Sequence, residues 1–219
     1  MLKIVFSELA FLGKPVLQNV RDLMRAGCPN IELMTDGDGW DDLDGRWDAL
    51  VAELPKTGAS FSLHPPAWDI NLTSPLGELR DAAYALHEKS IEFAHKIGAS
   101  YVVLHPGFCN SSAFDKSRAR GLARETAEKL AVKAKSLDLR LAFENVGYHG
   151  SSLYTGEEFC HALDGLDETL GYLIDTGHAH LNHWDVPALI DRLKDRLIGI
   201  HLHDNNAEAD RHLPVYEGS

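Results

Sequence analysis

The sequence predicts an α/β fold in which parallel strands close into a barrel and helices cover its outside. Short, almost wholly apolar runs alternate with segments of helical periodicity along the chain, which is typical of a parallel sheet buried on both faces. Polar side chains recur where these runs end, at the edge where barrel enzymes build their sites. The glycine-rich segment 36–39 lacks G-x-G-x-x-G followed by a helix, so a dinucleotide-binding fold gains little support.

Seven apolar runs are predicted to be strands, because each is short and apolar and several are bounded by turn residues. Pro65 and Pro106 stop the third and fourth runs. The predicted strands are residues 2–6, 30–34, 59–64, 100–105, 139–144, 170–175 and 197–201.

Helices are predicted between the strands, where apolar residues recur at helical spacing. Pro15 suits the first turn of the first helix and Gly27 suits its exit. The acidic, glycine-rich segment 35–45 is predicted to be a loop. No linker or composition break divides the chain, so residues 1–219 are expected to form a single domain. The predicted helices are residues 15–26, 47–54, 76–97, 118–136, 156–163 and 187–193.

Composition indicates a soluble, cytoplasmic protein. Hydrophobic residues make up 44% and charged residues 25% of the 219 residues, and no apolar run approaches the roughly 18 residues of a membrane span. Glu8 in the first apolar stretch argues against a signal peptide. The three widely spaced cysteines fit a reducing compartment. The net charge of −12 argues against a broad nucleic-acid surface, although a local patch stays open as an alternative.

The segment 170–178 gives the first indication of a functional site. Its apolar run 170–174 ends in Asp175, and His178 follows three residues later. Gly177 is expected to turn the chain between them. A carboxylate and an imidazole this close can bind one metal ion or share a proton. The same event, an apolar strand that ends in His, Glu or Asp, recurs through most of the chain.

Acidic and imidazole side chains follow six successive predicted strands, about one βα unit apart. In a barrel these ends converge on one rim, where histidines and carboxylates without paired cysteines favour Zn²⁺ or Mn²⁺. Without a cation, such a buried cluster would repel itself or stay unpaired. The residues are Glu32, His64, His105, Glu144, Asp175 with His178, and His201 with His203, followed by Asp210 and His212 in a loop over the rim.

Each of these residues also has a plain structural interpretation. A single strand-end histidine such as His64 is more often a satisfied surface or loop residue, and Glu32 alone fits a rim charge or hydrogen-bond partner. The case for a site therefore rests on repetition. Three histidines are interpreted as ordinary helix residues and three loop histidines are left without a role: His87, His95 and His161, then His149, His180 and His183.

With these motifs the sequence resembles the xylose-isomerase-like barrel superfamily, which contains sugar isomerases and epimerases and the endonuclease IV type of DNA-repair enzyme. The resemblance implies a TIM (β/α)8-type barrel that lacks the eighth βα unit, because the chain stops soon after Glu217. The missing unit would leave a gap in the barrel. Either the chain is shortened, or a partner or a rearranged terminus closes this gap. The motifs run from residues 104–107, 143–145 and 174–179 to 201–205, 210–214 and 217–218.

The resemblance implies two ligand patterns. In the isomerase pattern, Glu144, Asp175 and His201 hold one Mn²⁺-like ion, and the family's final Glu ligand is absent. In the endonuclease pattern, further residues hold up to three Zn²⁺ ions, so one to three divalent ions are expected. The additional residues are His64, His105, His178, Asp210 and His212.

The first functional hypothesis is an isomerase or epimerase that acts on a sugar, sugar phosphate or polyol through a metal-stabilised enediolate. Glu144 is the candidate ligand and base, and His178 and His203 are candidates for moving protons or holding hydroxyl groups. Because the final Glu is missing, activity of this chain stays an open point. Three aromatic residues just beyond strand ends are expected to pack on the sugar: Trp68, Phe108 and Tyr148.

Two other hypotheses remain open. A zinc-dependent phosphodiesterase of the endonuclease IV type is favoured by the many histidines and disfavoured by the acidic composition, since duplex DNA needs basic contacts. A non-catalytic metal-binding barrel is motivated by the missing strand. The expected partner is a small sugar, with no membrane involved, and unpaired strand edges make a homo-oligomer plausible. Metal content separates the hypotheses.

Overall fold

The computed structural model describes residues 3–11 and 13–219. Its strands form one sheet in which every strand runs parallel to its neighbour and pairs with the next strand in the sequence. The predicted parallel α/β fold is therefore confirmed. The strands are β1 Phe6–Ser7, β2 Asn30–Met34, β3 Ser60–His64, β4 Tyr101–Leu104, β5 Arg140–Glu144, β6 Leu170–Asp175 and β7 Leu197–His201.

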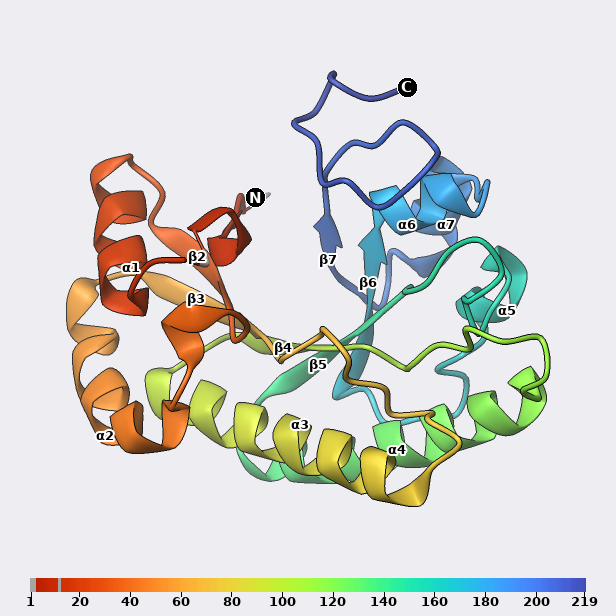
Figure 1. The fold of residues 1–219 in the computed structure, drawn as a ribbon, viewed down its shortest axis with the longest axis horizontal. Coiled ribbons are helices and arrows are strands. Elements are labelled where there is room, and N and C mark those ends of the chain that lie inside the picture. The colour runs from red at the N-terminus through yellow and green to blue at the C-terminus, as the bar shows by residue number, and fades with distance from the viewer. Residues whose placement is uncertain (1–2, 12) are drawn as a thin grey trace.

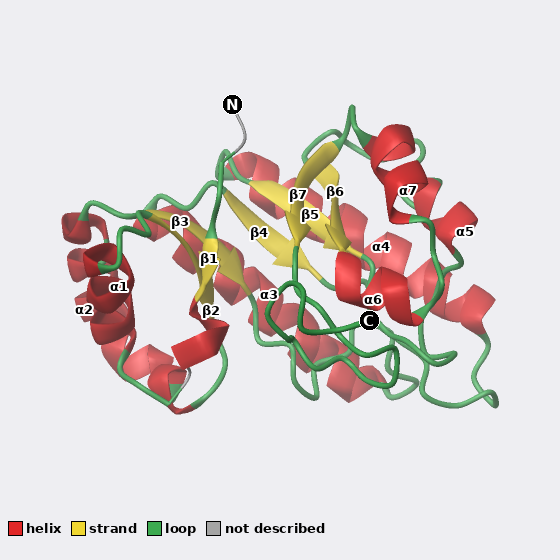
Figure 2. Cartoon of the chain, turned by 90° about the horizontal axis from the view of Figure 1, so that it is seen from above, coloured by secondary structure: helices red, strands yellow, loops and turns green. Residues whose placement is uncertain are grey.

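The helices lie on the outer side of the curled sheet, where α3 and α4 run alongside each other (Figure 1). Seen from above, α1 and α2 stand at one end of the sheet and α5 and α7 at the other (Figure 2). The helices are α1 Val16–Arg25, α2 Leu43–Glu53, α3 Gly77–Ile97, α4 Lys116–Ser136, α5 Gly156–Cys160, α6 Thr176–Leu181 and α7 Val186–Leu193, with short 3₁₀ turns η1 Glu8–Phe11, η2 Asp38–Trp40 and η3 Pro55–Thr57.

Successive side chains along each strand point to opposite faces of the sheet, and the apolar ones form two separate clusters. One set of strand residues, such as Ile31 and Leu63, packs with the helices in the main core. The residues between them form a small inner cluster of Val103, Ala142 and Leu173. Because side chains two apart on a strand share a face, a polar residue two positions after an inner residue also points into the barrel. The alternation thus directs the strand-end polar residues inward.

The structure corrects several predicted elements. Strand pairing begins only at Phe6, so the expected strand 2–6 is wrong for residues 3–5, and Leu2 lies outside the described residues. The expected loop 35–45 contains η2 and the start of α2, which Asp42 caps by accepting a hydrogen bond from the backbone N–H of Gly45. His180 lies in helix α6 rather than in a loop.

The two outer strands are less covered than the rest of the sheet. Within the described residues, β1 pairs only with β2, and β7 pairs only with β6. Phe6 on β1 and Ile200 on β7 are exposed. These edges match the expectation that an eighth strand is absent from the sheet.

A separate finding concerns membranes: across residues 3–11 and 13–219, no helix combines the length and apolar character that a bilayer crossing requires.

His87 gives a testable pH dependence of stability. This α3 residue is buried, and its Nδ1–H donates to the Ala83 carbonyl oxygen. Burial lowers the pKa of His87 to about 4 from its ordinary 6.5. The unfolded chain therefore binds this proton between pH 6.5 and 4 while the folded chain does not, so stability falls as the pH falls through this window. The expected contribution is about 3 kcal/mol.

Urea unfolding of the wild-type chain and of His87→Leu at pH 7 and pH 4 measures this contribution. We expect the variant to lose less stability on acidification, because its side chain cannot take up the proton. An equal loss in both chains would show that His87 does not cause the dependence.

Candidate metal centre

Residues at all six predicted strand-end positions face the inside of the barrel, and those at five of the positions form one group. The alternation described above points these side chains inward, from five different strands or the residues just after them. Glu144 and Asp175 are almost completely buried, each with 1% of its surface exposed, so their charges need partners within the protein. The group consists of His64, His105, Glu144, Asp175 and His201.

Glu144 is the hub of this group. Its Oε2 lies 2.9 Å from His105 Nε2 and 3.7 Å from His64 Nε2. Its Oε1 lies 3.0 Å from His201 Nδ1, which is also 3.9 Å from Asp175 Oδ2. The Nδ1–H of His64 donates to the Pro65 carbonyl oxygen at 2.8 Å, which leaves Nε2 free to accept or to ligate.

Asp175 connects this group to helix α6. Its Oδ1 accepts a hydrogen bond from the backbone N–H of His178 at 2.7 Å and so caps the helix. Its Oδ2 lies 3.0 Å from His203 Nε2. This cap explains why residues 176–181 form a helix, which the sequence analysis did not predict.

A second group gathers around Asp210 in the loop after β7. Asp210 Oδ2 lies 3.2 Å from both His178 Nε2 and His212 Nε2. The rings of His203 and His212 stack, with centroids 3.9 Å apart. His178 donates its Nδ1–H to the Asn145 carbonyl oxygen at 2.9 Å, which orients its Nε2 toward Asp210.

The charges of the two groups shift their proton affinities. Burial alone would raise the pKa of Glu144, but the charges of His201 and His105 hold it well below its ordinary value. Burial favours the neutral form of His178, yet Asp175 and Asp210 raise its pKa to about 9. Glu144 is therefore ionised and His178 is protonated at neutral pH, which suits a ligand and a proton donor respectively.

The chemistry of these side chains fits a divalent cation. Three sets of residues, two of which share Glu144, each place their ligand atoms within 4.8 Å of one another. His203 Nδ1 and Asp210 Oδ1 are buried without a hydrogen-bond partner, as expected of groups that await a ligand. The sets are His64, His105 and Glu144; Glu144, Asp175 and His178; and His203, Asp210 and His212.

The three aromatic residues proposed to contact substrate lie in different surroundings. The ring of Tyr148 stacks on His178, with centroids 6.4 Å apart, and so borders the second group. Trp68 is exposed, and its backbone N–H and that of Ala67 donate to Asp36. Phe108 is partly buried, and its carbonyl oxygen accepts from Asn71. Of these three side chains, Tyr148 is the one that contacts a site residue within the part of the chain that the structure describes.

Asn145 was not assigned a role from the sequence, and Glu32 was not expected to be buried. Asn145 forms a pair of hydrogen bonds with the backbone of Asp175, through Nδ2 to the carbonyl oxygen at 3.0 Å and from the Asp175 N–H to Oδ1 at 2.7 Å. It thereby fixes the ends of β5 and β6. Glu32, interpreted as a rim charge or hydrogen-bond partner, lies buried beside His201. The position of Asn145 directly after Glu144 was the sequence feature that could have indicated its role.

Gly177 does not turn the chain, as the sequence had suggested, but makes room for His203. It lies inside α6, and a Cβ atom added to it would lie 2.0 Å from Cε1 of the His203 ring. We expect Gly177→Ala to push this ring away from Asp175 and to destabilise the fold by about 1–3 kcal/mol. Urea unfolding and the His203 ring signals in NMR spectra measure both effects.

Gly121 provides the matched control for Gly177. It also lies in a helix, α4, but a Cβ atom there would meet nothing within 4 Å. Gly121→Ala should stabilise the chain by about 0.5–1 kcal/mol, because alanine restricts the unfolded chain more than glycine does. Unchanged His203 signals and unchanged stability in Gly177→Ala would contradict the packing argument.

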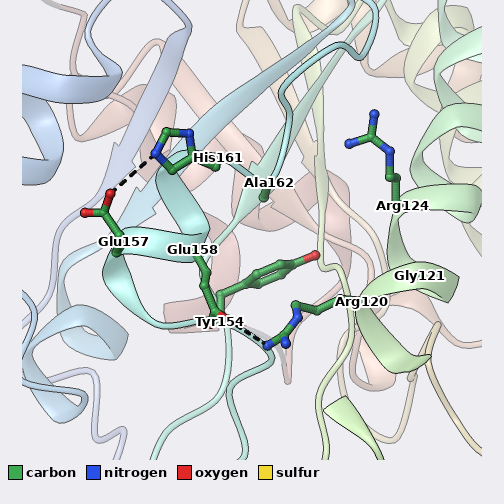
Figure 3. Close-up of a pocket in the computed structure, with 8 residues that line it drawn as sticks. All are labelled: Arg120, Gly121, Arg124, Tyr154, Glu157, Glu158, His161 and Ala162. Atoms are coloured by element: carbon green, nitrogen blue, oxygen red, sulfur yellow. Dashed lines mark ion pairs between the residues drawn. The ribbon is translucent and has the colours of Figure 1, made fainter. Parts of the chain in front are cut away.

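A separate cavity of about 430 Å³ lies between α4 and the segment from Tyr154 to Ala162 that contains α5 (Figure 3). Arg120 pairs with Glu158 at 3.2 Å, and His161 lies 3.4 Å from Glu157. Arg124 donates to the Asp164 carbonyl oxygen. Because these charged groups already have partners, the cavity lacks the convergent free groups of the metal centre.

Comparison with known proteins finds similarity to a probable endonuclease and, in fold, to an epimerase-like protein. The chain is 26% identical over 182 residues to a probable endonuclease 4 of Thermoplasma volcanium, an alignment that covers 77% of this chain and 62% of that protein. A crystal structure of a D-tagatose 3-epimerase-like protein superimposes with a TM-score of 0.85 at 21% identity, covering 100% of this chain and 82% of that one.

A third similar structure is that of the IOLI protein, which was solved with a zinc atom. Its TM-score is 0.83 at 15% identity, and the match covers 100% of this chain and 81% of that one. At these identities the two structures establish the fold, so the curled sheet is a TIM-type barrel. The family described as the xylose isomerase-like TIM barrel matches residues 20–219, and this chain therefore belongs to it.

Proposed function

We propose that the chain is a divalent-metal-dependent isomerase or epimerase that acts on an uncharged sugar or polyol. The convergence of Glu144, Asp175 and His201 Nδ1 at one rim supports the metal dependence. The epimerase-like and zinc-bound neighbours support it at the level of the fold. A bound divalent ion would supply Lewis-acid polarisation of a substrate carbonyl.

The observation that favours an uncharged substrate is the charge of the loops that follow the strands. The loops after β2, β3, β4, β5 and β7 contain a single Lys or Arg residue, Arg211. Acidic residues such as Asp36, Asp204 and Glu208 lie in the same loops. A duplex nucleic acid needs several Lys or Arg contacts to its phosphates, and this rim offers too few.

The protein's own side chains would divide the work. Glu144 and Asp175 are ionised and serve as ligands. Glu144 is also the candidate base that would remove the proton from the carbon next to the substrate carbonyl group. His178, protonated at neutral pH, would donate a proton to a substrate oxygen, and His203 beside Asp175 would orient a hydroxyl group. Tyr148 would border the substrate next to His178.

The test is proton exchange with solvent. The Mn²⁺-loaded chain is incubated with a panel of ketopentoses and ketohexoses in D₂O, and NMR follows deuterium entering the carbon next to the carbonyl group. Exchange that stops on addition of EDTA and is absent in Glu144→Gln supports the proposal. Absence of exchange across the panel, with the metal bound, overturns it.

A zinc-dependent phosphodiesterase is the second candidate. The specific observation in its favour is the additional group formed by His178, Asp210 and His212, which a centre with one ion does not need. The similarity to a probable endonuclease 4 points the same way. Two or three Zn²⁺ ions per chain together with nicking of an abasic-site oligonucleotide would support this candidate and contradict the isomerase.

A further inference from the structure

Glu32 is a buried carboxylate that the proposed chemistry does not use. It lies on β2 with 5% of its surface exposed, and it faces the inside of the barrel with Ser62 and Tyr101. Its two carboxylate oxygens have different partners, and this difference suggests its role.

Oε2 of Glu32 accepts two hydrogen bonds from hydroxyl groups. The Ser62 hydroxyl donates at 3.0 Å and the Tyr101 hydroxyl at 3.1 Å. These two donors come from β3 and β4, so they fix the orientation of the carboxylate from neighbouring strands. Oε1 is thereby left to face across the barrel.

Oε1 of Glu32 lies 2.9 Å from His201 Nε2. The oxygen is off the axis of the ring N–H, and Nε2 has no better aligned partner. The opposite nitrogen, Nδ1, lies 3.0 Å from Glu144 Oε1 and on the side of Asp175. The His201 ring thus stands between one carboxylate at Nε2 and two at Nδ1.

A neutral imidazole carries its proton on only one nitrogen, and only the other nitrogen can bind a metal ion. A negative charge held beside Nε2 favours the proton there and leaves the lone pair of Nδ1 free. Carboxylates play this role behind metal-binding histidines in other proteins. In this chain the placement of Glu32, Ser62 and Tyr101 would set the ring for ligation through Nδ1.

We propose that Glu32 is a positioning residue that holds the proton of His201 on Nε2 and so presents Nδ1 to a divalent ion beside Glu144 and Asp175. The inference rests on the proposed metal centre, but not on the reaction that the centre performs. The Tyr101 hydroxyl supports it by holding the Glu32 carboxylate.

Two measurements test this role without an activity assay. A competing chelator gives the Zn²⁺ affinity of the metal-loaded chain, and ¹⁵N NMR of its histidine rings identifies the tautomer of His201. We expect Glu32→Gln to lower the Zn²⁺ affinity by roughly 10–100-fold and to reduce the fraction of His201 that ligates through Nδ1. Tyr101→Phe should lower the affinity by a smaller factor.

Glu8 supplies the matched control, because it is also a buried carboxylate near the start of the barrel. Its partners are Asn19 Nδ2, Trp40 Nε1 and the Met34 backbone N–H, and among the described residues it has no hydrogen bond or ion pair with a proposed ligand. Glu8→Gln should reduce stability against urea while leaving the Zn²⁺ affinity unchanged. If Glu8→Gln lowered the Zn²⁺ affinity as much as Glu32→Gln does, general destabilisation would explain both losses. That result would overturn the proposal.

Two further results would overturn it. One is wild-type Zn²⁺ affinity in Glu32→Gln with His201 still bound through Nδ1. The other is wild-type protein in which Zn²⁺ does not contact His201 at all. If instead the Glu32 effects are observed but no sugar exchanges protons, the positioning role stands and the proposed isomerase function fails.

Discussion

Glu144→Gln is expected to lower the affinity for a divalent metal ion by at least ~100-fold, because it removes a charged ligand and not only a supporting residue. Both oxygens of Glu144 face imidazoles, His105 on one side and His201 on the other. Glutamine keeps the size of the side chain but offers one neutral oxygen. Isothermal titration with Mn²⁺ and Zn²⁺ measures the loss.

Without a bound metal ion, the site of the Glu144→Gln chain should also differ in charge from that of the wild-type chain. With the Glu144 carboxylate gone, the pKa of His201 should fall, because Glu144 is the largest of the charges that raise it against burial. Glu8→Gln, with its carboxylate remote from the ligands, serves as the control for folding. A Glu144→Gln chain with wild-type metal affinity would remove Glu144 from the site.

The second large effect is the pH dependence of metal binding. Burial disfavours the charged form of His201, but Glu144 and Glu32 raise its pKa well above 6.5, so the metal-free ring is protonated at neutral pH. A ligating ring must lose its proton, so binding releases it to solvent. The apparent affinity should therefore rise by roughly tenfold per pH unit above pH 6.5 until the ring's own pKa is reached.

Calorimetric titrations in buffers of different ionisation enthalpy count the released protons, and a pH series gives the slope. His161, an exposed histidine at the end of α5, provides the control, because His161→Asn should leave both quantities unchanged. An affinity that is flat between pH 6.5 and 8 in the wild-type chain would show that no protonated imidazole is displaced.

Sequence patterns predicted the strands best where an apolar run has sharp limits. Residues 30–34, 170–175 and 197–201 form strands with the predicted bounds. The first strand was overestimated because apolar character alone does not supply a pairing partner, and only Phe6 and Ser7 reach β2. Helix α6 was missed because its six residues depend on a single side-chain cap from Asp175.

The convergence of the strand-end residues followed from the repeated βα pattern, since parallel strands of a barrel end on one rim. The contacts within the group did not follow, because they depend on how far the sheet curls. The approach of Glu32 to His201 joins the second and seventh strands across the barrel. The close packing of Gly177 against His203 likewise requires the position of the loop after β7.

The proposed function depends on a divalent ion that binds among the strand-end residues. A crystal structure of the Mn²⁺-loaded protein, with anomalous scattering recorded at the manganese edge, tests it most directly. We expect an anomalous peak coordinated by Glu144, Asp175 and Nδ1 of His201. Manganese peaks that occur only elsewhere on the protein, with these three side chains uncoordinated, would contradict it.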